Sequence, residues 1–159
     1  MIRLFTIFLL SLVLIFPCNG TAETRKKYRQ SAYINNAYFS DKMSQDGGNA
    51  YPLNVVKTLQ NRAAGVVGYF VLDLVLTSSG THQFTVDILD RNGKKSTELL
   101  YPPVKVDNKD EMPLYTAAGA ISGNLEPGMW FFKVRDQVNS NQAEMLGTFG
   151  ILITVAGKE

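Results

Sequence analysis

The sequence predicts an all-β protein, a two-sheet antiparallel sandwich of about seven strands that follows a cleaved signal peptide. Apolar and polar residues alternate with a period of two along much of the chain, and turn-forming Gly, Pro, Asn and Asp residues separate these stretches. The 3.6-residue period of helices is almost absent. With 159 residues, 45% of them hydrophobic, the chain is long enough for one packed domain and too short for two substantial ones.

The amino-terminal residues have the layout of a secretory signal peptide. Arg3 precedes an apolar run over residues 4–16, and Pro17 and small residues follow it. This run is shorter than the roughly 18 to 20 residues that span a bilayer. We expect cleavage after Ala22, with Gly20 as the alternative. The mature chain, without a transmembrane segment, is then periplasmic or secreted.

Cys18 allows a second interpretation, because bacterial lipoproteins carry their lipid on a cysteine at the end of such a run. Small residues precede the cysteine in lipoprotein signals, whereas Ile15, Phe16 and Pro17 precede Cys18. Lipidation through Cys18 is therefore the less favoured alternative. If Cys18 leaves with the signal peptide, the mature chain has no cysteine and forms no disulfide.

Basic residues gather just after the expected cleavage site, in the segment 23–31. From Ser31 onward the chain has 11 basic and 13 acidic residues, a net charge of about −2. The basic segment is explained by a flexible, solvated terminus, which we favour, or by attraction to anionic lipid, worth up to about 1 kcal/mol per basic residue. Nucleic-acid binding is not expected, because the chain is exported and the domain over residues 32–159 has no basic face.

Seven stretches of alternation, each bounded by turn residues, are the expected strands. They cover residues 32–40, 66–77, 82–89, 97–106, 115–122, 129–136 and 146–155. Residues 43–64 join the first two and have room for one short strand around residues 55–59. Turns are expected at residues 78–80, 90–93 and 126–128, where Gly, Asn, Asp and Pro are concentrated.

Alternation also assigns side chains to the core, because successive residues on a strand point to opposite faces. The expected core residues are Phe84, Val86, Ile88, Trp130, Phe132, Val134, Phe149, Ile151, Ile153 and Val155. The second strand is apolar on both faces, with Phe70, Leu72, Leu74 and Leu76 on one and Tyr69, Val71 and Val75 on the other. One face of an antiparallel sheet is usually wet. Either part of residues 43–64 covers the second face, or a partner does. We favour cover within the chain, because Tyr51, Leu53 and Val55 are available for it.

Part of the chain resembles a known class of domains. The stretch from Gly80 through the 90–93 turn, the turn at 125–130 into an aromatic strand, and the closing strand with Gly147 and Phe149 resemble small exported bacterial immunoglobulin-like domains. The resemblance covers roughly residues 66–155. It implies a binding, assembly or accessory module, although fold alone implies no activity. The paired cysteines of antibody domains are absent.

Residue types that carry catalysis are scarce. His82 is the only histidine, so a Ser-His-Asp or Cys-His site has one possible base and no supporting motif. We expect His82 to be an exposed residue near a turn. A zinc site lacks ligands of the usual types. The sequence thus predicts no catalytic residue and no cofactor.

Calcium is the remaining metal to weigh. Asp87, Asp90 and Asn92 crowd one turn, but Ile88 and Leu99 stand where an EF-hand loop needs acidic residues. A looser oxygen cage stays open as an alternative, formed by Asp107, Asn108, Asp110 and Glu111. We predict no metal site, because polar turns usually have this composition without a metal.

Two surface features are candidate binding sites. The first is an apolar outer face, formed by Tyr69, Val71, Val75, Met129 and Phe131, which lie opposite the core residues of their strands. The second is the polar connection 137–144, with Asn139 and Asn141, because loops on rigid sandwiches often bind ligands.

The preferred function is a non-enzymatic exported module that binds a protein or an envelope component. The alternative is a carbohydrate-binding module in which Tyr69 or Phe131 stacks on a sugar, and an enzyme ranks third. Clustered exposed aromatic rings would favour a sugar ligand. A continuous aliphatic patch or an open strand edge would favour a protein, and a pocket with convergent carboxylates would favour catalysis.

Overall fold

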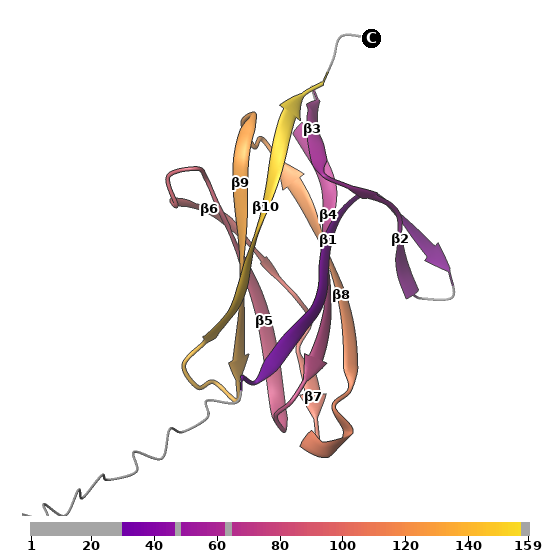
Figure 1. Ribbon diagram of the computed structural model, residues 1–159, viewed down its shortest axis with the longest axis vertical. Helices are drawn as coiled ribbons and strands as arrows, with labels where there is room; N and C mark the ends of the chain where they lie inside the picture. The colour runs from indigo at the N-terminus through magenta and orange to yellow at the C-terminus, as the bar shows by residue number, and fades with distance from the viewer. Residues whose placement is uncertain (1–29, 47–48, 63–64, 157–159) are drawn as a thin grey trace, which may run out of the picture.

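The computed structural model describes residues 30–46, 49–62 and 65–156, which form ten strands and one 3-10 helix. The strands are β1 (Ala32–Asp46), β2 (Asn49–Val56), β3 (Thr58–Arg62), β4 (Gly65–Leu76), β5 (Gly80–Leu89), β6 (Lys95–Leu100), β7 (Val104–Val106), β8 (Leu114–Gly123), β9 (Gly128–Val138) and β10 (Glu144–Val155), and helix η1 is Lys109–Glu111 (Figure 1). The expected signal peptide, Cys18 and the basic cluster at residues 25–29 lie outside the described residues.

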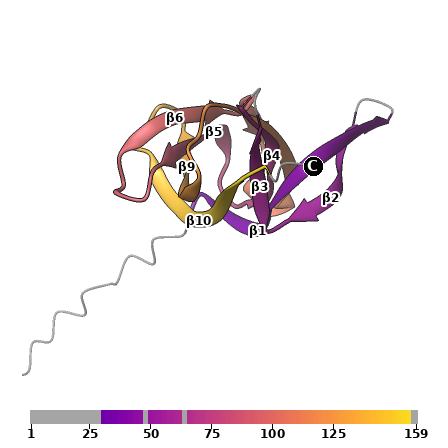
Figure 2. The same ribbon diagram turned by 90° about the horizontal axis from the view of Figure 1, so that it is seen from above.

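The strands form two layers that join at one end. Hydrogen bonds run in the order β2-β1-β4-β3-β10-β9-β5-β6, with β7 beside β5 and β8 beside β4. β3 pairs with the start of β4 and also, in parallel, with β10, so it links the layers (Figures 1 and 2). We call β2-β1-β4-β8 the first sheet and β10-β9-β5, with β6 and β7, the second sheet.

The predicted all-β sandwich is confirmed, with corrections of detail. There are ten strands in the described residues rather than about seven, and the β3–β10 pair is parallel. The expected strand 97–106 is two strands, because Pro102 and Pro103 interrupt it and proline has no N–H for a ladder. The single short strand expected around residues 55–59 is also two, the end of β2 and the start of β3.

The core lies between the sheets and follows the predicted alternation. Phe70 of the first sheet packs against Phe132 of the second, with ring centroids 5.1 Å apart, and Phe39 lies 4.8 Å from Phe70. Trp130 is 8% exposed, as predicted, and its Nε1–H donates to the Glu126 carbonyl at 2.8 Å.

Two residues at the edge of the core depart from the prediction. Val155, expected in the core, is 70% exposed, because it is the last residue of β10 and lies past the final buried position, Ile153. Phe149 is only partly buried, at the seam where β10 passes β1.

The connection 43–64 does not cover the outer face of β4. β2 pairs with the second half of β1, from Phe39 onward, and this hairpin extends away from the sandwich (Figures 1 and 2). We call the hairpin the arm and the rest of the sandwich the body. Leu53 and Val55, two of the residues offered for covering that face, are largely exposed on the arm. The expectation of intramolecular cover is therefore wrong for these residues. In the part of the chain that the structure describes, no helix is long and apolar enough to cross a membrane.

Candidate functional site

Over β4, β8 and β1 as far as Ser40, the outer face of the first sheet carries almost no charge. The register sets its residues in rows across β1, β4 and β8: Tyr33, Val75 and Leu114; Asn36, Asp73 and Thr116; Tyr38, Val71 and Ala118; and Ser40, Tyr69 and Ala120. Asp73 is the one charged side chain in these rows, and it accepts a hydrogen bond from Thr116 Oγ1 at 2.8 Å. Leu114 is 63% exposed, and Val67, further along β4, is 58% exposed. We call these rows together with Val67 the apolar face.

Val71 lies in the middle of the apolar face but has no exposed surface. Its row neighbour Tyr38 and its strand neighbour Tyr69 both have larger side chains. Burial and then the Asp73 carboxylate raise the pKa of Tyr38, so this phenol is neutral. The expectation that Val71 itself contacts a partner is corrected, while Tyr69 and Val75 stay partly accessible.

Met129 and Phe131 do not lie on the apolar face. They belong to β9 in the second sheet, where Met129 pairs with Leu152 and Phe131 with Gly150. Because the outer faces of a sandwich point in opposite directions, the five residues predicted as one face are divided between two. This correction also rules out one aromatic platform built from Tyr69 and Phe131.

The outer face of the second sheet is charged in the rows around Asp87, and it also carries the exposed apolar side chains of Met129, Met145, Leu152 and Leu100. Asp87 pairs with Lys95 and with Arg135, each at 2.8 Å. Lys133 and Glu98 flank Asp87 in the same row. The rows around Asp87 are therefore more highly charged than the rows across β1, β4 and β8.

The polar connection between β9 and β10 is partly structural. Asn139 has φ 48°, its Oδ1 accepts the Thr81 N–H at 2.8 Å, and its amide occupies the space that a Cβ at Gly80 would need. Asn139 thus holds the loop against β5 rather than facing a ligand. Asn141 is exposed, and no hydrogen bond of its side chain is formed within the described ranges.

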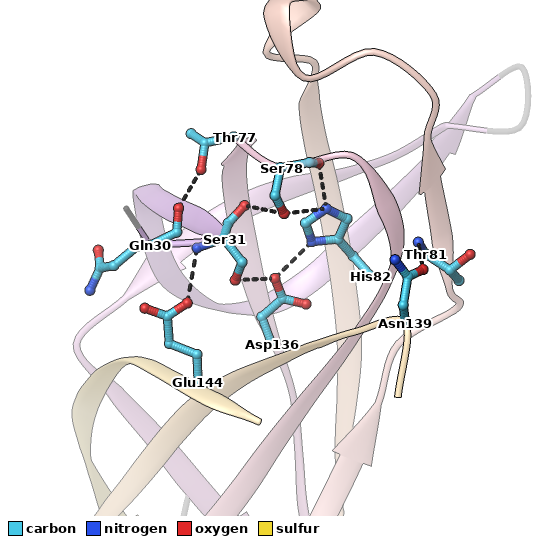
Figure 3. Close-up of polar contacts among 9 residues, drawn as sticks. All are labelled: Gln30, Ser31, Thr77, Ser78, Thr81, His82, Asp136, Asn139 and Glu144. Carbon is cyan, nitrogen blue, oxygen red and sulfur yellow. Dashed lines mark hydrogen bonds and ion pairs between the residues drawn. The ribbon is translucent and has the colours of Figure 1, made fainter. Parts of the chain in front are cut away.

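His82 is buried, which corrects the expectation of an exposed turn residue. Figure 3 shows His82 between Asp136 and Ser78, with Ser31 beyond the carboxylate. His82 Nδ1 lies 2.7 Å from Asp136 Oδ2, and the two side chains have no exposed surface. Asp136 Oδ2 also accepts the hydroxyl of Ser31 at 2.6 Å, and the Ser31 N–H donates to Glu144 Oε2 at 2.9 Å. The cluster thus fastens the start of β1 to β5, β9 and β10.

The His82 cluster contains Ser, His and Asp, but its geometry is not that of a catalytic triad. His82 Nε2 is 3.0 Å from the Ser78 carbonyl oxygen and 3.4 Å from the Ser78 hydroxyl. The nearer group is an acceptor, so Nε2 carries a proton and does not serve as a base for that hydroxyl.

Both ring nitrogens of His82 face acceptors, an arrangement that the charged imidazolium satisfies. Burial lowers the pKa of His82, but the hydrogen bond to Asp136, the Ser78 carbonyl and the Asp136 charge outweigh it, and the pKa is raised above 6.5. The cluster is best described as a buried ion pair. Its second carboxylate oxygen, Asp136 Oδ1, is buried without a hydrogen-bond partner.

In the polar turns considered as calcium sites, side-chain oxygens accept hydrogen bonds from the backbone of the same turn. Asp90 Oδ1 accepts the N–H groups of Asn92 and Lys94, and Asn108 Oδ1 accepts that of Asp110 at the start of η1. Among the described residues, no group of three or more His, Cys, Asp or Glu side chains could hold a metal ion.

A hollow of about 630 Å³ lies where the arm leaves the body. Its lining includes three basic side chains, Lys42, Lys57 and Arg62, and one acid, Asp41. A hollow with one carboxylate lacks the paired acids that hydrolysis of a glycoside requires.

No protein-family model and no curated protein matches the sequence. Solved structures do match the fold. The C-terminal domain of Wzt aligns with 12% identity and a TM-score of 0.52, over 81% of this chain and 75% of that chain. A β-glucuronidase from Bacteroides uniformis aligns with 9% identity and a TM-score of 0.50, over 76% of this chain and 14% of that chain.

An immunoglobulin-like protein from Pseudomonas aeruginosa also aligns, over 77% of this chain and 96% of that chain, with 9% identity. Its TM-score is only 0.39, so this alignment adds nothing to the description of the fold. At these identities the comparisons support the β-sandwich and say nothing of activity.

Proposed function

We propose that this chain is an exported, non-enzymatic binding module that docks onto a protein of the cell envelope through the apolar face. The difference in charge between the apolar face and the rows around Asp87 carries this proposal. The rows across β1, β4 and β8 contain one charged side chain, whereas the opposite face has an ion-pair network around Asp87. Depletion of charge and enrichment of tyrosine mark the centres of protein interfaces.

The chemistry of the apolar face defines its partner. The face has the exposed Val67 and Leu114 near its two ends and tyrosines between them, which fits an apolar surface of another folded protein. Beside Val67 it borders the hollow lined by basic side chains. β8 supports a protein partner too, because it pairs only with β4 among the described strands and so has one open edge. The open edge is a feature expected for a protein ligand, and the exposed Val67 and Leu114 lie on the same face of this strand pair.

The proposal also includes export of the chain and a role without catalytic activity. Catalysis is disfavoured by the buried, doubly hydrogen-bonded His82, which has no exposed surface for a substrate to reach. Export is supported by the signal-like residues 1–22, which end about ten residues before β1 begins.

The proposal is tested with two matched leucine variants. Leu114→Glu places a charge on the apolar face, and Leu152→Glu places the same charge on the outer face of the second sheet, where Leu152 is 40% exposed. We expect capture of the partner from envelope extract to weaken by at least about 30-fold with Leu114→Glu, the factor for losing a hot spot of about 2 kcal/mol. Leu152→Glu should leave capture unchanged.

Equal capture by the two variants would overturn the assignment of the face. Light scattering of the purified protein tests one further outcome, in which the partner is a second copy of this chain. A dimer that Leu114→Glu dissociates would show self-association through the apolar face and would overturn docking onto another envelope protein.

A further inference from the structure

A groove of about 490 Å³ lies in the seam between the two sheets, where β1 passes β10. On this side β2 pairs with β1 only from Phe39 onward, and β3 pairs with β10 only from Leu152 onward. The earlier part of β1 and the earlier part of β10 therefore face the seam with strand edges that have no ladder partner in the described ranges. The volume is within the roughly 300–1,000 Å³ that is typical of small-molecule sites.

The floor of the groove is apolar and belongs to the margin of the core. Ile34 and Ala37 from β1 and Leu146 and Phe149 from β10 line it, all partly buried against the core cluster. The Phe149 ring is held at this place, since its centroid lies 5.8 Å from that of Phe70. The floor thus offers one aromatic ring and aliphatic carbons that are not fully covered.

The rim of the groove is polar and uncharged. It consists of the amides of Gln30, Asn35 and Asn36 and the ring of Tyr33, which is 46% exposed. Asn35 and Asn36 are exposed, and within the part of the chain that the structure describes their side chains form no hydrogen bond. Each amide has donors and an acceptor to offer to a ligand.

Both strands that border the groove are bulged at this point. The register of β1 against β4 shifts between Ile34 and Asn36, so Asn35 is an extra residue. The register of β10 against β9 shifts between Met145 and Gly147, so Leu146 is extra. Bulges redirect side chains and often occur beside binding sites. They also disturb a regular ladder, which disfavours the addition of a third strand to either edge.

We infer that this groove binds a neutral oligosaccharide. A sugar presents hydroxyl groups, which both donate and accept hydrogen bonds, and C–H faces, which pack against aromatic rings. The three rim amides match the hydroxyls, and Tyr33 and Phe149 match the C–H faces. Among the residues that the structure describes, no lysine, arginine, aspartate or glutamate lines the groove, so this lining offers no ion-pair partner to a charged glycan.

The site overlaps the protein-docking surface proposed above at Tyr33 and Asn36, which belong to both, and is otherwise distinct from it. The two proposals are tested separately because Asn35 lines the groove and is absent from the rows of the apolar face, whereas Val67 and Leu114 lie on that face and do not line the groove. A chain with both sites would connect an envelope protein to a glycan.

The test uses the protein expressed from its full coding sequence, with amide groups labelled for NMR. Maltohexaose, cellohexaose and chitohexaose are the neutral probes, and a hyaluronan hexasaccharide is the charged one. We expect at least one neutral probe, at up to about 10 mM, to shift the signals of Asn35, Asn36 and Gln30, since a Kd of about 1 mM is then nearly saturated. The hyaluronan probe should bind at least about tenfold more weakly.

Matched asparagine variants provide the control. Asn35→Ala with Asn36→Ala should weaken binding at least about tenfold, the effect of losing one or two net hydrogen bonds. Asn141→Ala, at the exposed tip of the β9–β10 connection, should leave it unchanged. Unchanged thermal unfolding of all variants shows that the fold is retained.

Three results would overturn the inference. One is the absence of shifts at the groove with all three neutral probes. Another is equal binding by the Asn35→Ala/Asn36→Ala protein and the Asn141→Ala protein. The third is a response of the β1 and β10 backbone amides to a synthetic peptide with the sequence of β2 but not to any glycan, which would identify the seam as an acceptor for a strand.

Discussion

Replacing Asp136 by asparagine removes one charge from the buried ion pair with little change in side-chain volume. Asp136 Oδ2 lies 2.7 Å from His82 Nδ1 and 2.6 Å from Ser31 Oγ, and His82 and Asp136 are 0% and 1% exposed. Losing these charge-assisted hydrogen bonds costs roughly 1.5–3 kcal/mol, because the imidazolium left behind can release its proton instead of staying uncompensated. We expect the free energy of unfolding to fall by this amount at about pH 6.

The cost of Asp136→Asn should depend on pH. The pKa of His82 is raised in the folded protein, so the stability from its charged form is complete below the unfolded pKa near 6.5. That stability is lost as the pH rises through the folded pKa. Once His82 is neutral, the asparagine amide oxygen still accepts its Nδ1–H, so at about pH 9 the cost should shrink to about 1 kcal/mol.

Urea unfolding at both pH values measures these costs, with the fluorescence of Trp130 as the signal. Trp130 is the only tryptophan and is 8% exposed, so unfolding changes its surroundings strongly. Asp107→Asn is the control, because Asp107 pairs with Lys105 at the exposed surface and its loss should leave the midpoint unchanged. An Asp136→Asn cost that is equal at both pH values, or below about 1 kcal/mol at pH 6, would refute a charged buried pair.

Three further predictions follow from the fold and the sequence. Trp130→Ala should cost roughly 3–5 kcal/mol in unfolding followed by circular dichroism, because it empties a buried site between the sheets, and a cost below about 1 kcal/mol would contradict this packing. Tyr101→Phe should cost roughly 1–3 kcal/mol in urea unfolding, because the buried hydroxyl donates to the Phe70 carbonyl at 3.0 Å, and an unchanged midpoint would show that water replaces it. Intact-mass measurement of exported protein should show loss of residues 1–22, whereas a species that begins at Cys18 with added acyl mass would identify a lipoprotein.

Local alternation was sufficient to predict most strands and most of the core. Phe84, Val86 and Ile88 are buried as predicted, and so are Trp130, Phe132 and Val134. Each of these runs repeats every second residue over five positions, and such a pattern fits only one side of a strand. Val155 was wrongly assigned to the core, because alternation does not show at which residue of a strand the core ends.

The same alternation contains the signal for the buried ion pair. His82 lies on the same face of β5 as Phe84 and Val86, because these residues are two apart along the strand. Asp136 lies in the same way on the face of β9 that carries Phe132 and Val134. Polar residues in phase with a core are expected to be paired, because burial of a lone charge is costly. The pairing of His82 with Asp136 itself depends on the β5–β9 register, which a single sequence does not show.

The candidate binding surfaces could be predicted only in part. Tyr69 and Val75 were correctly placed opposite the core, but Met129 and Phe131 lie on the other sheet, because strand alternation says nothing about which sheet a strand joins. The seam groove depends on two bulges and on where β2 and β3 begin their pairing with neighbours distant in sequence. No local pattern in the sequence reports such long-range pairings.

Site-specific photo-crosslinking in the exporting cell tests the docking proposal most directly. A photo-reactive amino acid is placed at the position of Val67 or of Leu114 on the apolar face, and at that of Leu152 on the outer face of the second sheet. We predict crosslinks to one and the same envelope protein from the first two positions and none from the third. Crosslinks from Leu152 alone, equal crosslinks from all three positions, or none from any would contradict docking through the apolar face.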